Sequence, residues 1–185
     1  MNKILLFLMF SISQLFAGLI HPPDGSELSY IHIMFQWEAE SNTTEYKFEL
    51  SRDNFSTILI STTVTDLQYL VTDYINWQTA YSWRVSGDGG QSWINTFNFS
   101  TSESSATFQN DDNPIEILEY NPDLTSDGIT IFGSYYNNYS AAIDMNGNEV
   151  WNSGGVNTHV FFSVDEHNNY LGGKFLPQYN NSLIG

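Results

Sequence analysis

The sequence has no cysteine and only five basic residues, set against 21 acidic ones in a chain of 185 residues. Without cysteine, a disulfide framework, a thiolate zinc site and a cysteine nucleophile are all excluded. The formal net charge of −16 leaves too few cations to neutralise phosphates, which excludes a nucleic-acid binder. The same shortage argues against docking on an anionic membrane surface.

Aromatic residues are abundant, with 13 Phe, 11 Tyr and 5 Trp. A disordered acidic chain would lack this many large apolar side chains. No segment has a convincing helical period of 3.6 residues, whereas many segments alternate apolar and polar residues as strands do. The composition therefore predicts an all-β protein with a packed core.

Residues 1–17 have the layout of a secretory signal peptide. Lys3 precedes the apolar run Ile4–Phe10, and the small residue Ala17 stands before the expected cut. A membrane anchor is the alternative, but the run is shorter than the roughly 18 apolar residues that a spanning helix needs. We expect a secreted or periplasmic protein with no membrane span in the mature chain. Loss of Lys3 would make its net charge −17.

Residues 18–101 read as a sequence of short strands. Apolar and polar residues alternate in several segments, which buries one face of each strand. Turn-rich stretches such as Pro22–Gly25 and Gly87–Gly90 separate these segments. Several short strands that recur about every 8 to 12 residues predict a β-sandwich or barrel. The apolar positions expected to face the core are Ile31, Ile33, Phe35, Trp37, Ala39, Tyr46, Phe48, Leu50, Ile58, Ile60, Tyr69, Val71, Tyr81, Trp83, Val85, Trp93, Phe97 and Phe99.

This region resembles a fibronectin type III module. The residues that carry the resemblance are Trp37, the strand Tyr46–Leu50 and the run Tyr81–Val85, where such modules place a buried Tyr. The resemblance implies a β-sandwich over residues 18–101 that serves as a spacer or a binding platform.

Ser86–Trp93 fits the Asp-box pattern S-x-D-x-G-x-S/T-W. Sialidases carry this box, so a glycan-related function is one interpretation. The other is structural: Asp88 accepts hydrogen bonds from turn amides while Trp93 packs beneath them. We favour the structural interpretation, because the box lies between two predicted strands.

Residues 102–114 have the polar composition of a linker. Asp111 and Asp112 offer oxygen ligands of the kind that calcium prefers, but two carboxylates are too few to predict a site. We therefore expect a solvated linker, no metal site and no cofactor.

Residues 115–185 change pattern and predict short hairpins. Gly128–Gly133 is a strand candidate, and Asn146-Gly147 between apolar segments is a strong hairpin signal. A second hairpin is expected from Val160–Val164 into Tyr170–Gly172. Two hairpins, one with the pattern D-x-x-G-x-x-x-W at Asp144, Gly147 and Trp151, are typical of a propeller blade.

The fuller pattern resembles the opening of an arylsulfotransferase propeller. It comprises Thr125–Phe132, Ala141–Trp151, and His159 followed by Asn168–Leu171, a last segment that has no glycine where the family tends to have one. The resemblance covers about residues 120–175. It implies transfer of a sulfuryl group from a phenolic sulfate to a phenol, through a catalytic His and without a nucleotide donor.

His159 is the position that matches a channel-facing His of that family, which makes it the candidate substrate-binding residue. Its alternative role is that of a hydrogen-bonding His at the start of a strand. His21, His32 and His167 have no spacing that indicates a metal site or a triad. Tyr135, Tyr136 and Tyr139 could stack on phenols or glycans, or simply pack within strands.

Two classes of function stay open. One is an exported arylsulfotransferase-like enzyme, of which this chain would be the N-terminal part. The other is a non-catalytic exported binding or adhesion protein with a fibronectin-like module. A propeller needs at least about four blades, and residues 115–185 supply one to one and a half. We therefore expect the catalytic residues to lie beyond Gly185 and the 185-residue chain to be inactive alone.

Overall fold

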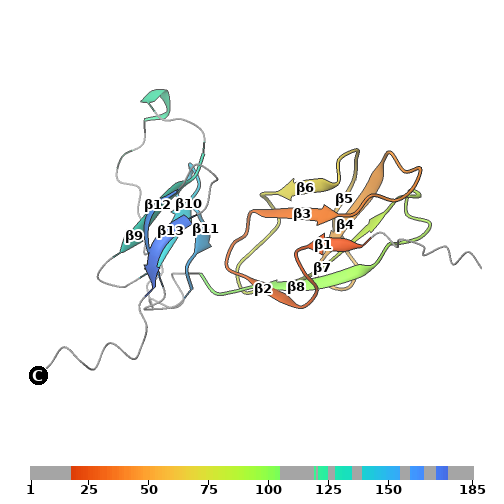
Figure 1. Ribbon diagram of the computed structural model, residues 1–185, viewed down its shortest axis with the longest axis horizontal. Helices are drawn as coiled ribbons and strands as arrows, with labels where there is room; N and C mark the ends of the chain where they lie inside the picture. Colours follow the sequence, from red (N-terminus) through yellow and green to blue (C-terminus); the bar gives the residue numbers. More distant parts are fainter. Residues whose placement is uncertain are drawn as a thin grey trace, which may run out of the picture.

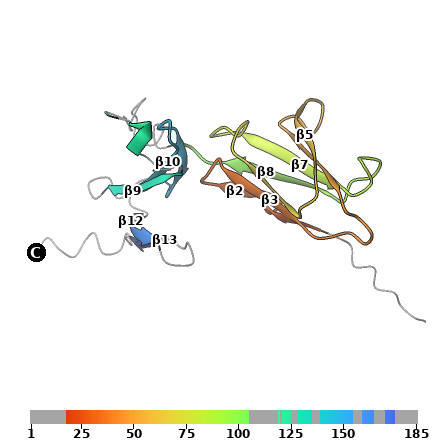
Figure 2. The ribbon, with the colours of Figure 1, turned by 90° about the horizontal axis from the view of Figure 1, so that it is seen from above.

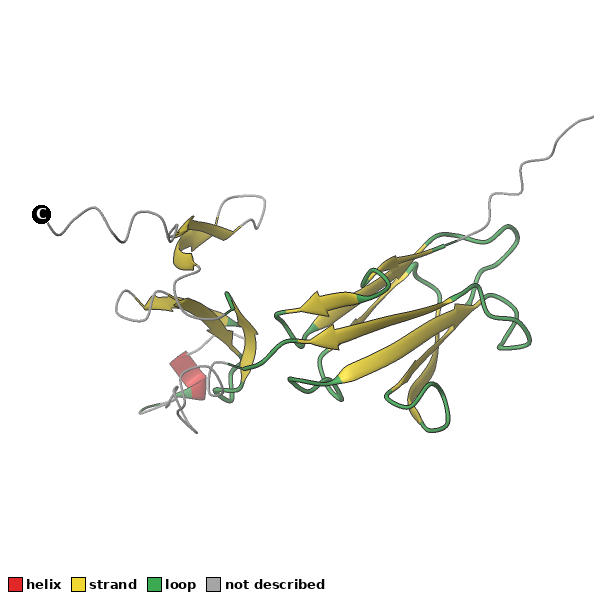
Figure 3. Cartoon of the chain, turned by 90° about the horizontal axis from the view of Figure 1, so that it is seen from below, coloured by secondary structure: helices red, strands yellow, loops and turns green. Residues whose placement is uncertain are grey.

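The computed structural model describes residues 18–104, 119, 121–124, 128–134, 139–154, 159–164 and 170–174. The signal peptide predicted over residues 1–17 and the pair Asp111 and Asp112 lie outside these ranges, as do His167, Tyr135 and Tyr136. Within them the chain is all-β apart from one short 3-10 helix, Pro122–Leu124. Figure 3 shows how strands dominate both units of the chain.

Among the described residues, eight strands build the first unit and five belong to the second, which lies beside the first (Figure 1). The first eight are β1 (Leu19–His21), β2 (Ser26–Leu28), β3 (Ile33–Trp37), β4 (Tyr46–Ser51), β5 (Ile58–Val64), β6 (Gln68–Val71), β7 (Ala80–Ser86) and β8 (Thr96–Thr101). The other five are β9 (Thr130–Ser134), β10 (Tyr139–Ile143), β11 (Glu149–Asn152), β12 (His159–Val164) and β13 (Tyr170–Lys174). No helix in the described part of the chain has the length and apolar character needed to cross a membrane.

The first unit consists of two sheets that share one core. One sheet has the strand order β1-β3-β6 and the other has the order β2-β8-β7-β4-β5. All pairs are antiparallel except β2 with β8, which is parallel. Figure 2 shows the strands of both sheets from above.

Aromatic rings fill the space between these two sheets. Phe35 of β3 packs edge-on against Phe48 of β4 at 4.9 Å and Trp83 of β7 at 5.1 Å between ring centroids. Such edge-to-face pairs add to the free energy gained by burying their area. The inward positions predicted for β3, β4 and β7 are confirmed, because they are buried: Ile33, Phe35, Trp37, Tyr46, Phe48, Leu50, Tyr81, Trp83 and Val85. The same prediction is wrong for Ile58 at the start of β5, which is 38 % exposed, and for Ala39, which is exposed beyond the end of β3.

Two turns at opposite ends of the β4–β7 pair have the same hydrogen-bond plan. In the predicted Asp-box, Ser86 Oγ donates to Asp88 Oδ1 at 2.6 Å and accepts from the N–H of Gly90 at 2.7 Å. After β4, Ser51 Oγ donates to Asp53 Oδ1 at 2.8 Å and accepts from the N–H of Phe55 at 2.9 Å. Hydrogen bonds from Ser86 and Ser92 hold the pKa of Asp88 far below its ordinary value. The hydrogen bonds of the Asp-box therefore stabilise the loop between β7 and β8.

Both loops also place a ring on the same cation. The Arg84 guanidinium lies 3.9 Å from the ring centroid of Phe55 and 3.9 Å from that of Trp93. Its Nη2 donates to Glu49 Oε2 at 2.7 Å. Trp93 lies in the loop before β8, so the prediction that it continues the alternation of Phe97 and Phe99 is wrong. This stack ties both hairpin loops to the middle of the five-stranded sheet.

The second unit is made of short antiparallel strands. One sheet has the order β11-β10-β9, and β12 pairs with β13 alone among the described strands. The predicted hairpin from Ala141 to Trp151 is therefore observed as β10 and β11. The strand expected from Gly128 begins at Thr130, and the predicted second hairpin is β12 with β13.

Candidate functional site

The β10–β11 turn holds the Asp and Gly of the predicted propeller-type pattern. Asp144 Oδ1 accepts from the backbone N–H groups of Asn146 and Asn148, both at 2.8 Å, and Oδ2 accepts from the Asn148 side chain at 2.9 Å. Burial acts to raise the pKa of Asp144, but these hydrogen bonds outweigh it and the pKa lies below 3.8. A carboxylate so fully used by its own turn is a structural group and a poor proton donor.

Gly147 supplies the left-handed backbone that this turn requires. Its φ is 83°, a region that residues with a Cβ rarely adopt. Its N–H donates to the Asp144 carbonyl at 3.1 Å, and the Asp144 N–H donates to the Asn148 carbonyl at 2.9 Å. Both members of the Asp-x-x-Gly pair therefore close the same turn.

His159, the candidate substrate-binding residue, is the first residue of β12. In the antiparallel register its partner on β13 is Lys174. Lys174 is the single basic residue of the sequence after position 102. The register thus brings the backbones of the one predicted His and the one nearby cation together.

The two other described histidines lie outside β12, with His21 on β1 and His32 directly before β3. His21 lies on β1 of the first unit, with Nε2 at 2.9 Å from the Tyr30 hydroxyl. Burial lowers the pKa of His21, so the neutral ring is favoured. Among the described residues there is no group of three His, Cys, Asp or Glu side chains able to hold a metal ion.

A junction that the sequence analysis missed joins the two units. Ile31 N–H donates to the Val150 carbonyl at 2.9 Å, and Asn152 N–H donates to the Ser29 carbonyl at 3.0 Å. Tyr30 is thereby bridged to Trp151 in antiparallel fashion. Residues 29–31 therefore extend the edge of the β11-β10-β9 sheet.

Side chains reinforce this junction. Trp77 Nε1 donates to the Glu149 carbonyl at 3.2 Å. Asn152, which is fully buried, donates through Nδ2 to the Glu103 carbonyl at 3.1 Å and to Glu149 Oε1 at 2.8 Å. No motif in residues 29–31 could have indicated this contact, because it depends on where the second unit docks.

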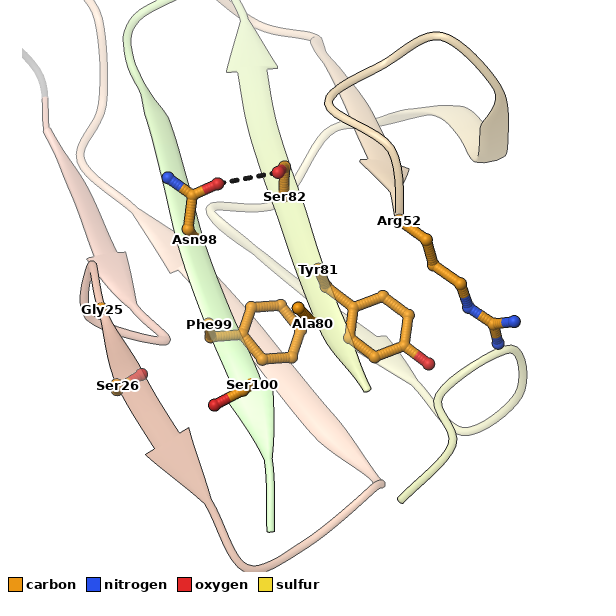
Figure 4. Close-up of a pocket in the computed structure, with 9 residues that line it drawn as sticks. All are labelled: Gly25, Ser26, Arg52, Ala80, Tyr81, Ser82, Asn98, Phe99 and Ser100. Atoms are coloured by element: carbon orange, nitrogen blue, oxygen red, sulfur yellow. Dashed lines mark hydrogen bonds between the residues drawn. The ribbon is translucent and has the colours of Figure 1, made fainter. Parts of the chain in front are cut away.

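A small depression lies over β2, β7 and β8 of the first unit (Figure 4). Its volume is about 170 Å³, below the roughly 300 Å³ of the smallest usual ligand pockets. Ser82 Oγ donates to Asn98 Oδ1 at 2.7 Å, and Arg52 Nη2 donates to the Tyr74 carbonyl at 3.0 Å. The Ser82, Asn98 and Arg52 side chains are thus engaged in hydrogen bonds, and the residues that line the depression include no nucleophile paired with a base.

Comparison with known protein families finds no match for this chain, and comparison with curated proteins finds none either. The established description is therefore an all-β chain of two strand-built units, joined through residues 29–31 and β11.

Proposed function

We propose that this chain is the N-terminal part of an exported arylsulfotransferase-like protein, in which a fibronectin type III-like β-sandwich carries the start of a β-propeller. The transfer would run from a phenolic sulfate to a phenol, through a catalytic His beyond this chain. The observation that carries the proposal is the order of antiparallel hairpins: β9 to β11 with the Asp144 turn, followed by the hairpin that His159 begins.

Strand order supports the sandwich half of the proposal. Sheets of three and five strands face each other across one core, an arrangement compatible with modules of this type. Tyr81, at the start of β7, accepts from the Asn76 N–H at 2.7 Å and donates to the Tyr74 carbonyl at 3.2 Å. A buried Tyr whose hydroxyl binds the backbone just upstream is the tyrosine corner of Ig-like sandwiches.

His159 has a defined role in the proposal. A neutral imidazole donates a hydrogen bond to a sulfuryl oxygen, and the Lys174 ammonium would stabilise negative charge that develops during transfer. Residues of one blade cannot enclose a channel, so the chain's own contribution is to bind and orient the donor.

The experiment is a transfer assay on the product of the whole reading frame that contains these residues. Purified protein is given 4-nitrophenyl sulfate and phenol, and release of nitrophenolate is followed by absorbance. We expect transfer that depends on phenol, and a loss of about 100-fold in kcat/KM for His159→Ala, the size typical of removing one charge-stabilising donor. His21→Ala, which removes a His of β1 in the first unit, is the matched control and should keep full activity.

A folded product without phenol-dependent transfer would contradict the enzyme proposal. The alternative is then a non-catalytic exported binding or adhesion protein. That alternative is favoured by the depression over β2, β7 and β8, whose Ser82, Asn98 and Arg52 side chains are engaged in hydrogen bonds and do not form a nucleophile–base pair.

A further inference from the structure

The two sheets of the first unit each leave one edge strand open on the same side. β5 ends the order of the five-stranded sheet and β6 ends that of the three-stranded sheet. Among the described strands, β5 pairs only with β4 and β6 only with β3. An edge strand presents a row of unpaired N–H and C=O groups, which can pair with another extended chain.

A groove of about 360 Å³ lies between these two edges. Its lining includes Ile60 of β5 and Tyr69 and Leu70 of β6. The Tyr69 ring packs on Phe48 of the core at 5.1 Å between centroids, so the inner wall of the groove is well supported. This volume lies at the small end of the range for binding sites.

Apolar side chains gather around the groove. Of the seven large hydrophobic residues that are exposed in the described chain, Leu70 and Tyr74 line the groove, and Ile58 and Leu67 lie on β5 and just before β6. Leu70 is 49 % exposed and Tyr74 is 60 % exposed. Clustered exposed apolar residues mark interaction surfaces, whereas scattered ones do not.

The charge around the groove selects the partner. Residues 58–74 contain Asp66 and Asp73 and no Lys, Arg or His, in a chain whose net charge is −16. The Arg52 guanidinium lies at the end of the groove, where it is already engaged by the Tyr74 carbonyl at 3.0 Å. Asp73 itself lines the groove. A second copy of this acidic chain would be repelled, whereas a cationic partner would be attracted.

We propose that the edge groove, formed by β5, β6 and residues 72–74, binds an extended segment of a partner protein in which apolar and basic residues alternate. The segment adds a strand to an open edge, its apolar side chains enter the groove, and its basic side chains face Asp66 and Asp73. Strand addition of this kind takes affinity from backbone hydrogen bonds and specificity from alternate side chains.

The test uses the full chain and a fluorescein-labelled peptide of alternating Val and Lys, seven residues long, followed by anisotropy at 0.15 M salt to screen distant charges. We expect saturable binding at micromolar peptide, and at least tenfold weaker binding by Leu70→Lys. Ile20→Lys is the matched control, because Ile20 is 50 % exposed on β1, the opposite edge of the same sheet. It should change the affinity less than twofold.

Equal loss in the two variants would mean that net charge alone drives binding, and would overturn the proposal. A peptide methylated on alternate backbone nitrogens should bind at least tenfold more weakly, and undiminished affinity would exclude strand addition. Sedimentation velocity should give a monomer without peptide. A dimer that Leu70→Lys dissociates would identify a second copy as the occupant and contradict the proposal.

Discussion

The first unit and the β9–β11 sheet differ in the number of described hydrophobic side chains that each buries. In the first, 14 buried hydrophobic residues form one cluster between two sheets. Among the residues of β9, β10 and β11 whose side chains are described, the buried hydrophobic ones are Ala141, Ala142 and Val150. Because burial of apolar area is the main favourable term in folding, the first unit can fold on its own core, while the second gains support from the junction.

The largest effect is expected from the core of the first unit. Trp83→Ala removes a side chain that is fully buried between the sheets and leaves a cavity, so the free energy of unfolding should fall by about 3–5 kcal/mol. Urea denaturation followed by tryptophan fluorescence and circular dichroism measures it. The control, Tyr74→Ala, changes an exposed aromatic residue and should stay within about 0.5 kcal/mol. Equal losses would show that the core does not hold this unit together.

The matching turns provide a comparison within the first unit. Ser86→Ala and Ser51→Ala each remove a buried hydroxyl that donates to an Asp and accepts from the backbone. Each should cost about 1–2 kcal/mol, the scale of one or two lost hydrogen bonds. Denaturant midpoints of the two variants should agree closely. A neutral result for either would mean that its turn is held by other contacts.

At the junction, Trp77→Phe removes one hydrogen bond, to the Glu149 carbonyl, and keeps most of the ring volume. We expect the free energy of unfolding of the second unit to fall by about 0.5–1.5 kcal/mol. The stability of the first unit should change little. Amide exchange measured by mass spectrometry should rise in β10 and β11 while that in β4 and β7 stays the same. Faster exchange in both units alike would mean that they unfold together.

Acid should weaken the chain through carboxylates on both sides of the junction. The pKa values of Asp53 and Asp144 lie below 3.8, and that of Asp88 lies far below it, through hydrogen bonds made only in the folded state. A folded pKa below the unfolded one gives stability that is present above the unfolded value and is lost as pH falls through the folded one. Denaturant midpoints should therefore fall from about pH 4 downward, and less steeply in Asp88→Asn. A flat profile would contradict these hydrogen bonds.

Local pattern was enough to predict the longer strands of the first unit, because burial alternates along β3 and the apolar positions predicted to face the core in β4 and β7 are buried. Phe35 and Trp83 were assigned to the core on alternation alone, and Asp144 and Gly147 to a hairpin on turn chemistry alone. The short strands β1 and β2 were not predicted, since three residues show no period. Residues 29–31 and β11 are more than a hundred positions apart, and their pairing depends on tertiary docking.

Contacts at the candidate site that depend on tertiary structure were likewise not predicted from the sequence. The sequence identified His159 and the register added Lys174 as its backbone partner, which no spacing rule predicts across a hairpin. The turn at Ser51 to Thr57 was missed as a second Asp-box-like loop, because Phe55 stands where the pattern has glycine. Its φ of 65° shows that the hydrogen-bond plan was kept without that glycine.

The most direct test of the dependence of the second unit on the first is Ile31→Pro. Proline has no N–H, so this variant deletes the hydrogen bond to the Val150 carbonyl. Hydrogen exchange should rise at least tenfold in β10 and β11 while β4 and β7 remain protected, and Ile31→Val should leave both unchanged. Unaltered exchange in β10 and β11 would contradict the account, because the second unit would then be stable without its junction.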